Sequence, residues 1–215
     1  MQQRLRTSLP ESEQILLAYV HALRDEGRTR EALESAKNFA ISHPDSQGAH
    51  RALLFMYGER GQRNEALQEF DELGRLEAVV ASDLVGAAVL VQADEAGLAA
   101  TYYERALELD ANNFEAHANL ATILIDTRRW DAAREHLAPA LNISTGSVPV
   151  LLNLGILERR AGRPQLAIEQ FENVLRLEPS NPLARQLLRE TQQHVTRDSA
   201  GITARRFGRP PATTE

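Results

Sequence analysis

The chain has 215 residues, of which 43% are apolar and only 5% aromatic, and this Ala- and Leu-rich composition predicts an all-α fold with a packed interior. The absence of cysteine excludes disulfides and cysteine-based metal centres. The formal net charge of −6 argues against nucleic acid as a partner, because binding to phosphate backbones depends on clustered basic residues.

Residues 1–12 form an N-terminal segment of their own. This segment lacks the apolar run of a signal peptide, and no part of the chain approaches the roughly 18 to 20 apolar residues of a membrane span, so no direct membrane insertion is expected. As written, the chain is expected in the cytoplasm, or in the periplasm if it was excised from a longer exported protein. Pro10 lies 34 residues before Pro44, so the segment is either the end of a preceding repeat or a capping box in which Ser8 and Glu11 start the first helix.

Residues 13–181 contain one pattern repeated five times. Small residues recur at intervals of 34, 33, 34 and 34 positions, at Ala32, Ala66, Ala99, Ala133 and Ala167. Further core positions follow four and seven residues later, which defines one helix face, and a second such face begins 15 or 16 residues upstream. Each repeat is therefore predicted to contain two helices. Glycines separate the paired helices at Gly27, Gly61 and Gly162.

Two repeats lack that glycine, and the chain continues beyond the fifth repeat. Asp94 stands at the glycine position in the third repeat, which is one residue shorter between its helices, and Arg128 stands there in the fourth. Residues 182–195 predict a capping helix that covers the last repeat with Leu183, Leu187 and Leu188. Residues 196–215 carry several arginines without an apolar stripe and are predicted to form a disordered basic tail.

The order of large, small, aromatic and proline positions resembles the tetratricopeptide repeat, a 34-residue helix pair. The closest copy runs from Leu151 through Ala167 and Phe171 to Pro179. The resemblance implies a right-handed α-solenoid superhelix of antiparallel helix pairs, in which the first helix of each pair lines a concave face. It also implies a role in binding other proteins.

The same resemblance implies which residues line a partner-binding groove. The stripe is mostly apolar with basic ends, which suits an amphipathic or acidic segment of a partner protein. Phe55 is the best candidate for an exposed anchor, whereas packing between helices is the alternative for each aliphatic residue. The expected groove residues are Leu17, His21, Arg51, Phe55, Val85, Val89, Asn119, Thr122, Leu152, Asn153, Ile156 and Arg159.

No motif for catalysis or for metal binding occurs in the sequence. The six histidines have no spacing that would place two metal ligands on one helix face, and no phosphate loop or nucleophile elbow is present. His50 and His117 occupy the same repeat position, so each is expected to pack between helices. Trp130 is likewise expected to pack on a neighbouring pair. No catalytic residue, metal ion or cofactor is predicted.

The sequence therefore predicts a non-catalytic scaffold or adaptor. Lys37 is the only lysine among 24 basic residues, a bias that indicates a bacterial origin. One alternative is a portion of a larger envelope assembly protein that acts in polysaccharide export or pilus biogenesis. A second alternative is the substrate-recruiting region of a longer enzyme. A third is a homo-oligomer that associates through the N-terminal face, formed by Leu16, Leu17, Tyr19, Val20 and Leu23.

Overall fold

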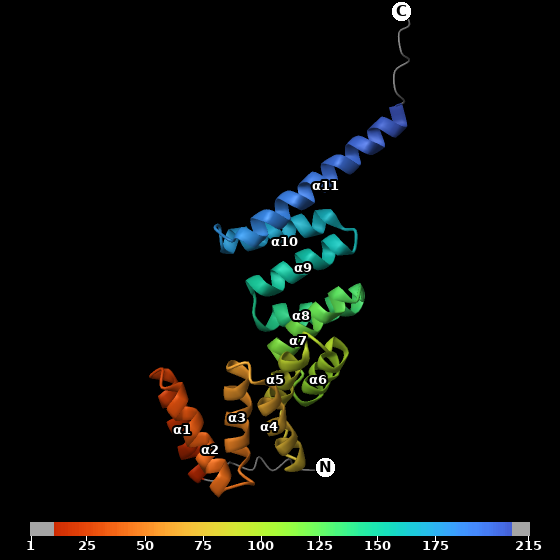
Figure 1. Cartoon of the computed structure of the whole chain (residues 1–215). Coiled ribbons are helices and arrows are strands. Elements are labelled where there is room, and N and C mark those ends of the chain that lie inside the picture. The colour runs from red at the N-terminus through yellow and green to blue at the C-terminus, as the bar shows by residue number, and fades with distance from the viewer. Residues whose placement is uncertain (1–10, 208–215) are drawn as a thin grey trace, which may run out of the picture. The chain divides into compact units, whose positions relative to one another are not determined.

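The computed structural model describes the backbone of residues 11–207 and the side chains of residues 11–197. This part of the chain contains eleven helices and no strand, so the predicted all-α fold of paired helices is confirmed (Figure 1). The chain divides between Ala111 and Asn112 into two compact units, called unit 1 and unit 2 below. The proposed repeat end within residues 1–10 lies outside the described residues, as do residues 208–215.

Unit 1 consists of three helix pairs. The helices are α1 (Glu11–Asp25), α2 (Thr29–Ser42), α3 (Gln47–Glu59), α4 (Arg63–Arg75), α5 (Ala81–Val91) and α6 (Ala96–Leu109). Within each pair the two helices pack on each other, and the first helices also pack in the order α1, α3 and α5. This second set of contacts places one face of each first helix on a common surface of the unit.

Unit 2 consists of two helix pairs and a final helix. The helices are α7 (Phe114–Asp126), α8 (Trp130–Ile143), α9 (Val148–Arg160), α10 (Pro164–Leu177) and α11 (Pro182–Phe207). The expected end of α11 at residue 195 is wrong, because the helical backbone continues to Phe207. Once a helix has formed, adding a residue is far easier than starting a new helix, so an apolar stripe is not required. No proline interrupts this extension, and Gly201 is its only glycine.

Small side chains determine how closely the paired helices approach. The repeated alanines are all fully buried, with exposed fractions of 0%, at Ala32, Ala66, Ala99, Ala133 and Ala167. A close contact lies between α9 and α10, where the buried Phe171 ring lies against the backbone of Gly155. A Cβ atom at Gly155 would be only 2.3 Å from Cε1 of Phe171. Position 155 on α9 therefore requires glycine, because the ring leaves no room for a side chain there.

Four of the turns between paired helices share one geometry. Each has a residue with positive φ, namely Gly27 at 76°, Gly61 at 69°, Arg128 at 61° and Gly162 at 76°. The next residue donates its N–H to the carbonyl five positions earlier, as in the 2.8 Å bond from Arg129 N to Leu124 O. The shorter turn of the third pair instead has a 2.8 Å bond from Glu95 N to Val91 O. Arg128 thus keeps the glycine conformation without being glycine.

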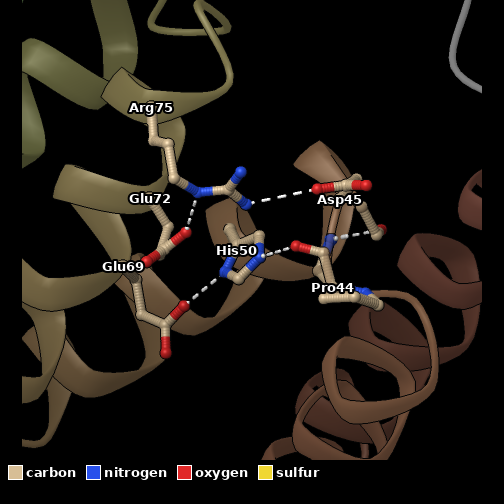
Figure 2. A network of polar contacts seen from close by, with 8 residues as sticks. Pro44, Asp45, His50, Glu69, Glu72 and Arg75 are labelled. Carbon is tan, nitrogen blue, oxygen red and sulfur yellow. Dashed lines mark hydrogen bonds and ion pairs between the residues drawn. The ribbon is translucent and has the colours of Figure 1, made fainter.

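A buried imidazole connects the turn before α3 to α4 (Figure 2). His50 Nδ1 lies 2.6 Å from Glu69 Oε2, and Nε2 lies 2.9 Å from the carbonyl oxygen of Pro44. Both partners are acceptors, so both bonds form fully only when both ring nitrogens carry hydrogen. Arg75 extends the network by bonding Glu72 at 2.6 Å and Asp45 at 3.2 Å.

The surroundings of His50 favour its charged form. Burial lowers the pKa of this imidazole, but the hydrogen bonds to Glu69 and Pro44 and the charges of Glu69 and Glu72 outweigh the burial and raise it above 6.5. The expectation that His50 packs between helices with its polar edge satisfied is confirmed. The same repeat position in unit 2 holds His117, whose Nδ1 lies 3.0 Å from Nδ1 of His136.

Replacing Gly155 by alanine should destabilise unit 2. The added Cβ would force the Phe171 ring out of its buried position, and overpacking of this kind costs about 1 to 3 kcal/mol. Gly97→Ala is the matched control, because a Cβ there meets no atom within 4 Å and should stabilise α6 by less than about 1 kcal/mol. Urea denaturation followed by circular dichroism measures both changes. Equal effects of the two substitutions would contradict this account of the packing.

Glu69→Gln should lower the pKa of His50 and flatten the dependence of stability on pH. A pKa raised on folding gives stability that is fully present below the unfolded value and is lost as the pH rises through the folded value. In the parent chain the free energy of unfolding should therefore fall as the pH rises from about 6 through that raised value. NMR titration of the imidazole and urea denaturation at several pH values measure both effects. Glu34→Gln, which removes only an exposed carboxylate beside Lys37, should change neither.

Candidate partner-binding groove

Two neighbouring hollows lie on the surface formed by the first helices of unit 1. The first has a volume of about 320 Å³ between α1 and α3, where it is lined by Leu17, Val20, His21, Arg51, Phe55 and Met56, among others. The second has a volume of about 360 Å³ between α3 and α5, where its lining includes Leu54, Phe55, Val85, Gly86, Val89 and Leu90. Apolar side chains make up most of both linings.

Phe55 forms the wall that the two hollows share. Its half-buried ring lies close to Gly86 on α5, where a Cβ atom would be 3.0 Å from Cε1 of Phe55. Arg51, Phe55 and Glu59 are spaced four residues apart, so they lie on one face of α3. The absence of a side chain at Gly86 thus leaves space for the ring between α3 and α5.

Arg51 serves a structural role that its position in the sequence did not indicate. Its Nε and Nη2 atoms bind the two oxygens of Asp83 at 2.8 and 2.9 Å, and Nη2 also donates to the carbonyl of Ala78 at 2.9 Å. Asp83 is fully buried and also accepts a 3.0 Å bond from the N–H of Val80 at the start of α5. A buried carboxylate requires such partners, so Arg51 is not the free basic group that we expected at this end of the stripe.

The other charged groups of these hollows are also paired. Arg24 forms an ion pair with Glu59 across α1 and α3. His21 is exposed in the lining of the first hollow, and Val89 is 56% exposed in the lining of the second. The structure therefore brings together Leu17, His21, Arg51 and Phe55 at the first hollow, and Phe55, Val85 and Val89 at the second.

The predicted groove residues of unit 2 mostly contact other helices of that unit. Asn153 on α9 donates a 3.1 Å bond to the hydroxyl of Thr122 on α7, and Asn119 is half-buried on α7. Leu152 and Ile156 pack against the buried cluster of Ala167, Phe171 and Leu187. For these two aliphatic residues the packing alternative therefore applies.

Arg159, the last predicted groove residue, binds α11. Its Nη1 lies 2.9 Å from Oε2 of Glu190. Hydrogen bonds from Gln186 and from Arg159 lower the pKa of Glu190. The guanidinium thus connects α9 to the helix that covers the last pair.

The face named for self-association is largely buried within unit 1. Leu16, Val20 and Leu23 have exposed fractions of 7%, 2% and 2%, because they point toward the neighbouring helices, whereas Tyr19 is 51% exposed. Ile15, which was not among the residues named, is 64% exposed and lies one turn before Tyr19. Of the five residues named, Tyr19 alone is exposed, and it lies with Ile15 on the face that α1 presents to solvent.

The described residues also include buried charged groups with no link to the hollows. Glu158 has an exposed fraction of 5% and binds Arg134 at 2.7 Å and Arg163 at 2.5 Å, so its charge is compensated. Across the described part of the chain, no group of three or more His, Cys, Asp or Glu side chains is placed to hold a metal ion. None of the helices described is both long and apolar enough to cross a bilayer.

Comparisons with known proteins agree with this architecture. Two family models, each described as a tetratricopeptide repeat, match residues 90–154 and 152–189. The chain is 32% identical over 97 residues to sperm-associated antigen 1 from Mus musculus, a match that covers 45% of this chain and 11% of that protein. The chain thus spans only a small part of the length of this curated relative.

Two solved structures have a similar fold over most of the chain. One is YrrB, described as a TPR protein with an unusual peptide-binding site, with a TM-score of 0.67, 18% identity and coverage of 80% of this chain and 89% of that one. The other is PilW, a type IV pilus biogenesis factor, with a TM-score of 0.72, 14% identity and coverage of 89% and 95%. Helix pairs with buried alanines at the repeat period, together with these matches, identify the chain: it belongs to the tetratricopeptide repeat family.

Proposed function

We propose that this chain is a non-catalytic scaffold that binds an amphipathic segment of a partner protein in the two hollows of unit 1. The tetratricopeptide fold supports a role in protein–protein interaction. The observation that carries the finer proposal is the position of Phe55, a half-buried aromatic ring shared by two apolar hollows. Aromatic side chains in such positions contribute much of the binding energy at protein interfaces.

The charges around the hollows favour an amphipathic segment over an acidic one. Arg24 is paired with Glu59, and Arg51 is paired with the buried Asp83. The charge of each arginine is thus already balanced by a carboxylate, which weakens its attraction for an acidic partner. The apolar side of an amphipathic helix, with residues about one turn apart, fits two adjacent apolar hollows and does not depend on these charges.

The proposed site is smaller than the groove expected from the sequence. Leu152, Asn153, Ile156 and Arg159 already contact other residues of unit 2, so we assign no partner to them. The proposal is thus limited to the residues on α1, α3 and α5.

The general scaffold is preferred to the narrower alternatives. The likeness to PilW is at 14% identity and concerns the fold, so it does not favour a role in envelope assembly over other scaffold roles. The arginine bias supports a bacterial origin. The recruiting region of a longer enzyme would use the same hollows, and therefore predicts the same binding.

Phe55→Glu should abolish binding of amphipathic peptides, and Phe55→Ala should weaken it by roughly tenfold or more, since removal of a central aromatic anchor often costs about 2 kcal/mol. Peptides selected from a random displayed library against the full chain provide the probes, and fluorescence anisotropy measures their affinity. Selected peptides should carry apolar residues three or four positions apart.

Ile41→Glu is the matched control, because Ile41 is 79% exposed on α2 and lies outside both hollows. It should leave peptide affinity unchanged. Unfolding midpoints show whether each variant is folded. Selected peptides that bind the folded Phe55→Glu variant as tightly as the parent chain would refute the proposed site.

A further inference from the structure

A third hollow lies in unit 2, at the edge formed by the turns within its helix pairs. It has a volume of about 400 Å³ and is lined by Ile125, Asp126, Arg128, Trp130 and Arg160. These residues come from the end of α7, the turn that follows it, the start of α8 and the end of α9. The hollow therefore combines the only tryptophan of the chain with two arginines.

The backbone at Arg128 is unusual for a residue with a side chain. Its φ is 61°, whereas the same turn position in three other pairs is glycine, at Gly27, Gly61 and Gly162. An L-residue in this conformation is strained because its Cβ lies too close to the following carbonyl, and glycine avoids that strain. A strained residue that lines a hollow is a reason to look for a function of its side chain.

Charge is left uncompensated at this hollow. Arg160 is bound to Asp126 at 2.6 Å, and the neighbouring Arg134 and Arg163 are bound to Glu158. By contrast, Arg128 and Arg129 are exposed, and neither side chain has a hydrogen-bond acceptor among the described residues. The guanidinium of Arg128 thus adds a positive charge that Asp126 does not balance.

The start of α8 carries the positive end of a helix dipole and, in its first turn, the carboxylate of Asp131, which lies 3.4 Å from Arg134. Trp130 is the first residue of this helix, and its N-cap residue, Arg129, makes no side-chain hydrogen bond to the first turn. The exposed N–H groups at a helix start carry the positive end of the helix dipole. Guanidinium groups bind carboxylates through two parallel hydrogen bonds, while the indole ring offers an apolar surface beside them.

We propose that this hollow binds an acidic segment of a partner protein, with a carboxylate on Arg128 and an adjacent aromatic or aliphatic side chain on Trp130. The site lies in unit 2 and shares no residue with the hollows of unit 1. The segment that binds here must carry negative charge, whereas the amphipathic segment proposed for unit 1 need not. The two proposals can therefore fail independently.

Trp130 makes the test direct, because all tryptophan fluorescence of the full chain comes from this hollow. The probes are the pentapeptide Glu-Phe-Glu-Leu-Glu, acetylated and amidated at its ends, the uncharged Gln-Phe-Gln-Leu-Gln with the same blocked ends, and inorganic phosphate. We expect a saturable fluorescence change with the acidic peptide and at least roughly tenfold weaker binding of the other two. No saturable change up to about 5 mM, or equal binding of phosphate, would overturn the proposal.

Arg128→Gly separates binding from folding. The substitution removes the guanidinium and supplies the residue that the turn prefers, so it should weaken the acidic peptide about tenfold or more and raise the unfolding midpoint by about 2 to 4 °C. Loss of affinity in a more stable protein cannot come from misfolding. Unchanged affinity in this variant would overturn the proposal.

Glu77→Gly is the matched control for the backbone. Glu77 is the other described residue with positive φ that is not glycine, at 52°, and it lies in unit 1. The substitution should raise the unfolding midpoint in the same way and leave binding of the acidic peptide unchanged. A loss of affinity in this control would mean that backbone relief, rather than the Arg128 side chain, controls binding.

Discussion

Close approach of paired helices is the constraint on which the other features of this structure depend. Fully buried alanines at the crossing points allow the backbones to come together, and at Gly155 even a methyl group is excluded by Phe171. Because the small residues recur at a fixed interval, each pair repeats the same geometry. The side chains of first helices that are not used in these crossings remain on the common surface of α1, α3 and α5, where the apolar hollows form.

The repeat period and the helix pairs could be predicted because they depend on local sequence patterns. Alanine spacing, the glycine turns and the family resemblance all report which residues meet within one pair. The hollows were predicted only in outline. Leu17, Phe55, Val85 and Val89 were identified from their place on the stripe, but the role of Arg51 depends on Asp83, which is 32 residues away and belongs to another pair. No pattern within one repeat contains that contact.

Other features could not be predicted because they depend on which neighbours a residue meets. Ile156 and Arg159 occupy the expected stripe, but Ile156 packs against residues of α10 and α11, and Arg159 binds Glu190 on α11. The hollow at Trp130 arises where the ends of α7 and α9 lie close to the start of α8, whereas the sequence indicated only packing for this tryptophan. Arg128 did leave a signal in the sequence, since it stands where the other turns have glycine. Interpreting that signal required the positive φ observed in the structure.

The bidentate contact between Arg51 and Asp83 has a consequence for how the surfaces respond to ionic strength. The charge of Arg51 is already balanced by Asp83 inside unit 1, so binding in the first hollow depends mainly on its apolar lining. Apolar contact of this kind is little affected by salt at physiological concentrations, whereas attraction to the exposed guanidinium of Arg128 weakens as added ions screen it. Dilute and concentrated salt would therefore select between partners, with the hollow of unit 2 losing its ligand first and the hollows of unit 1 keeping theirs.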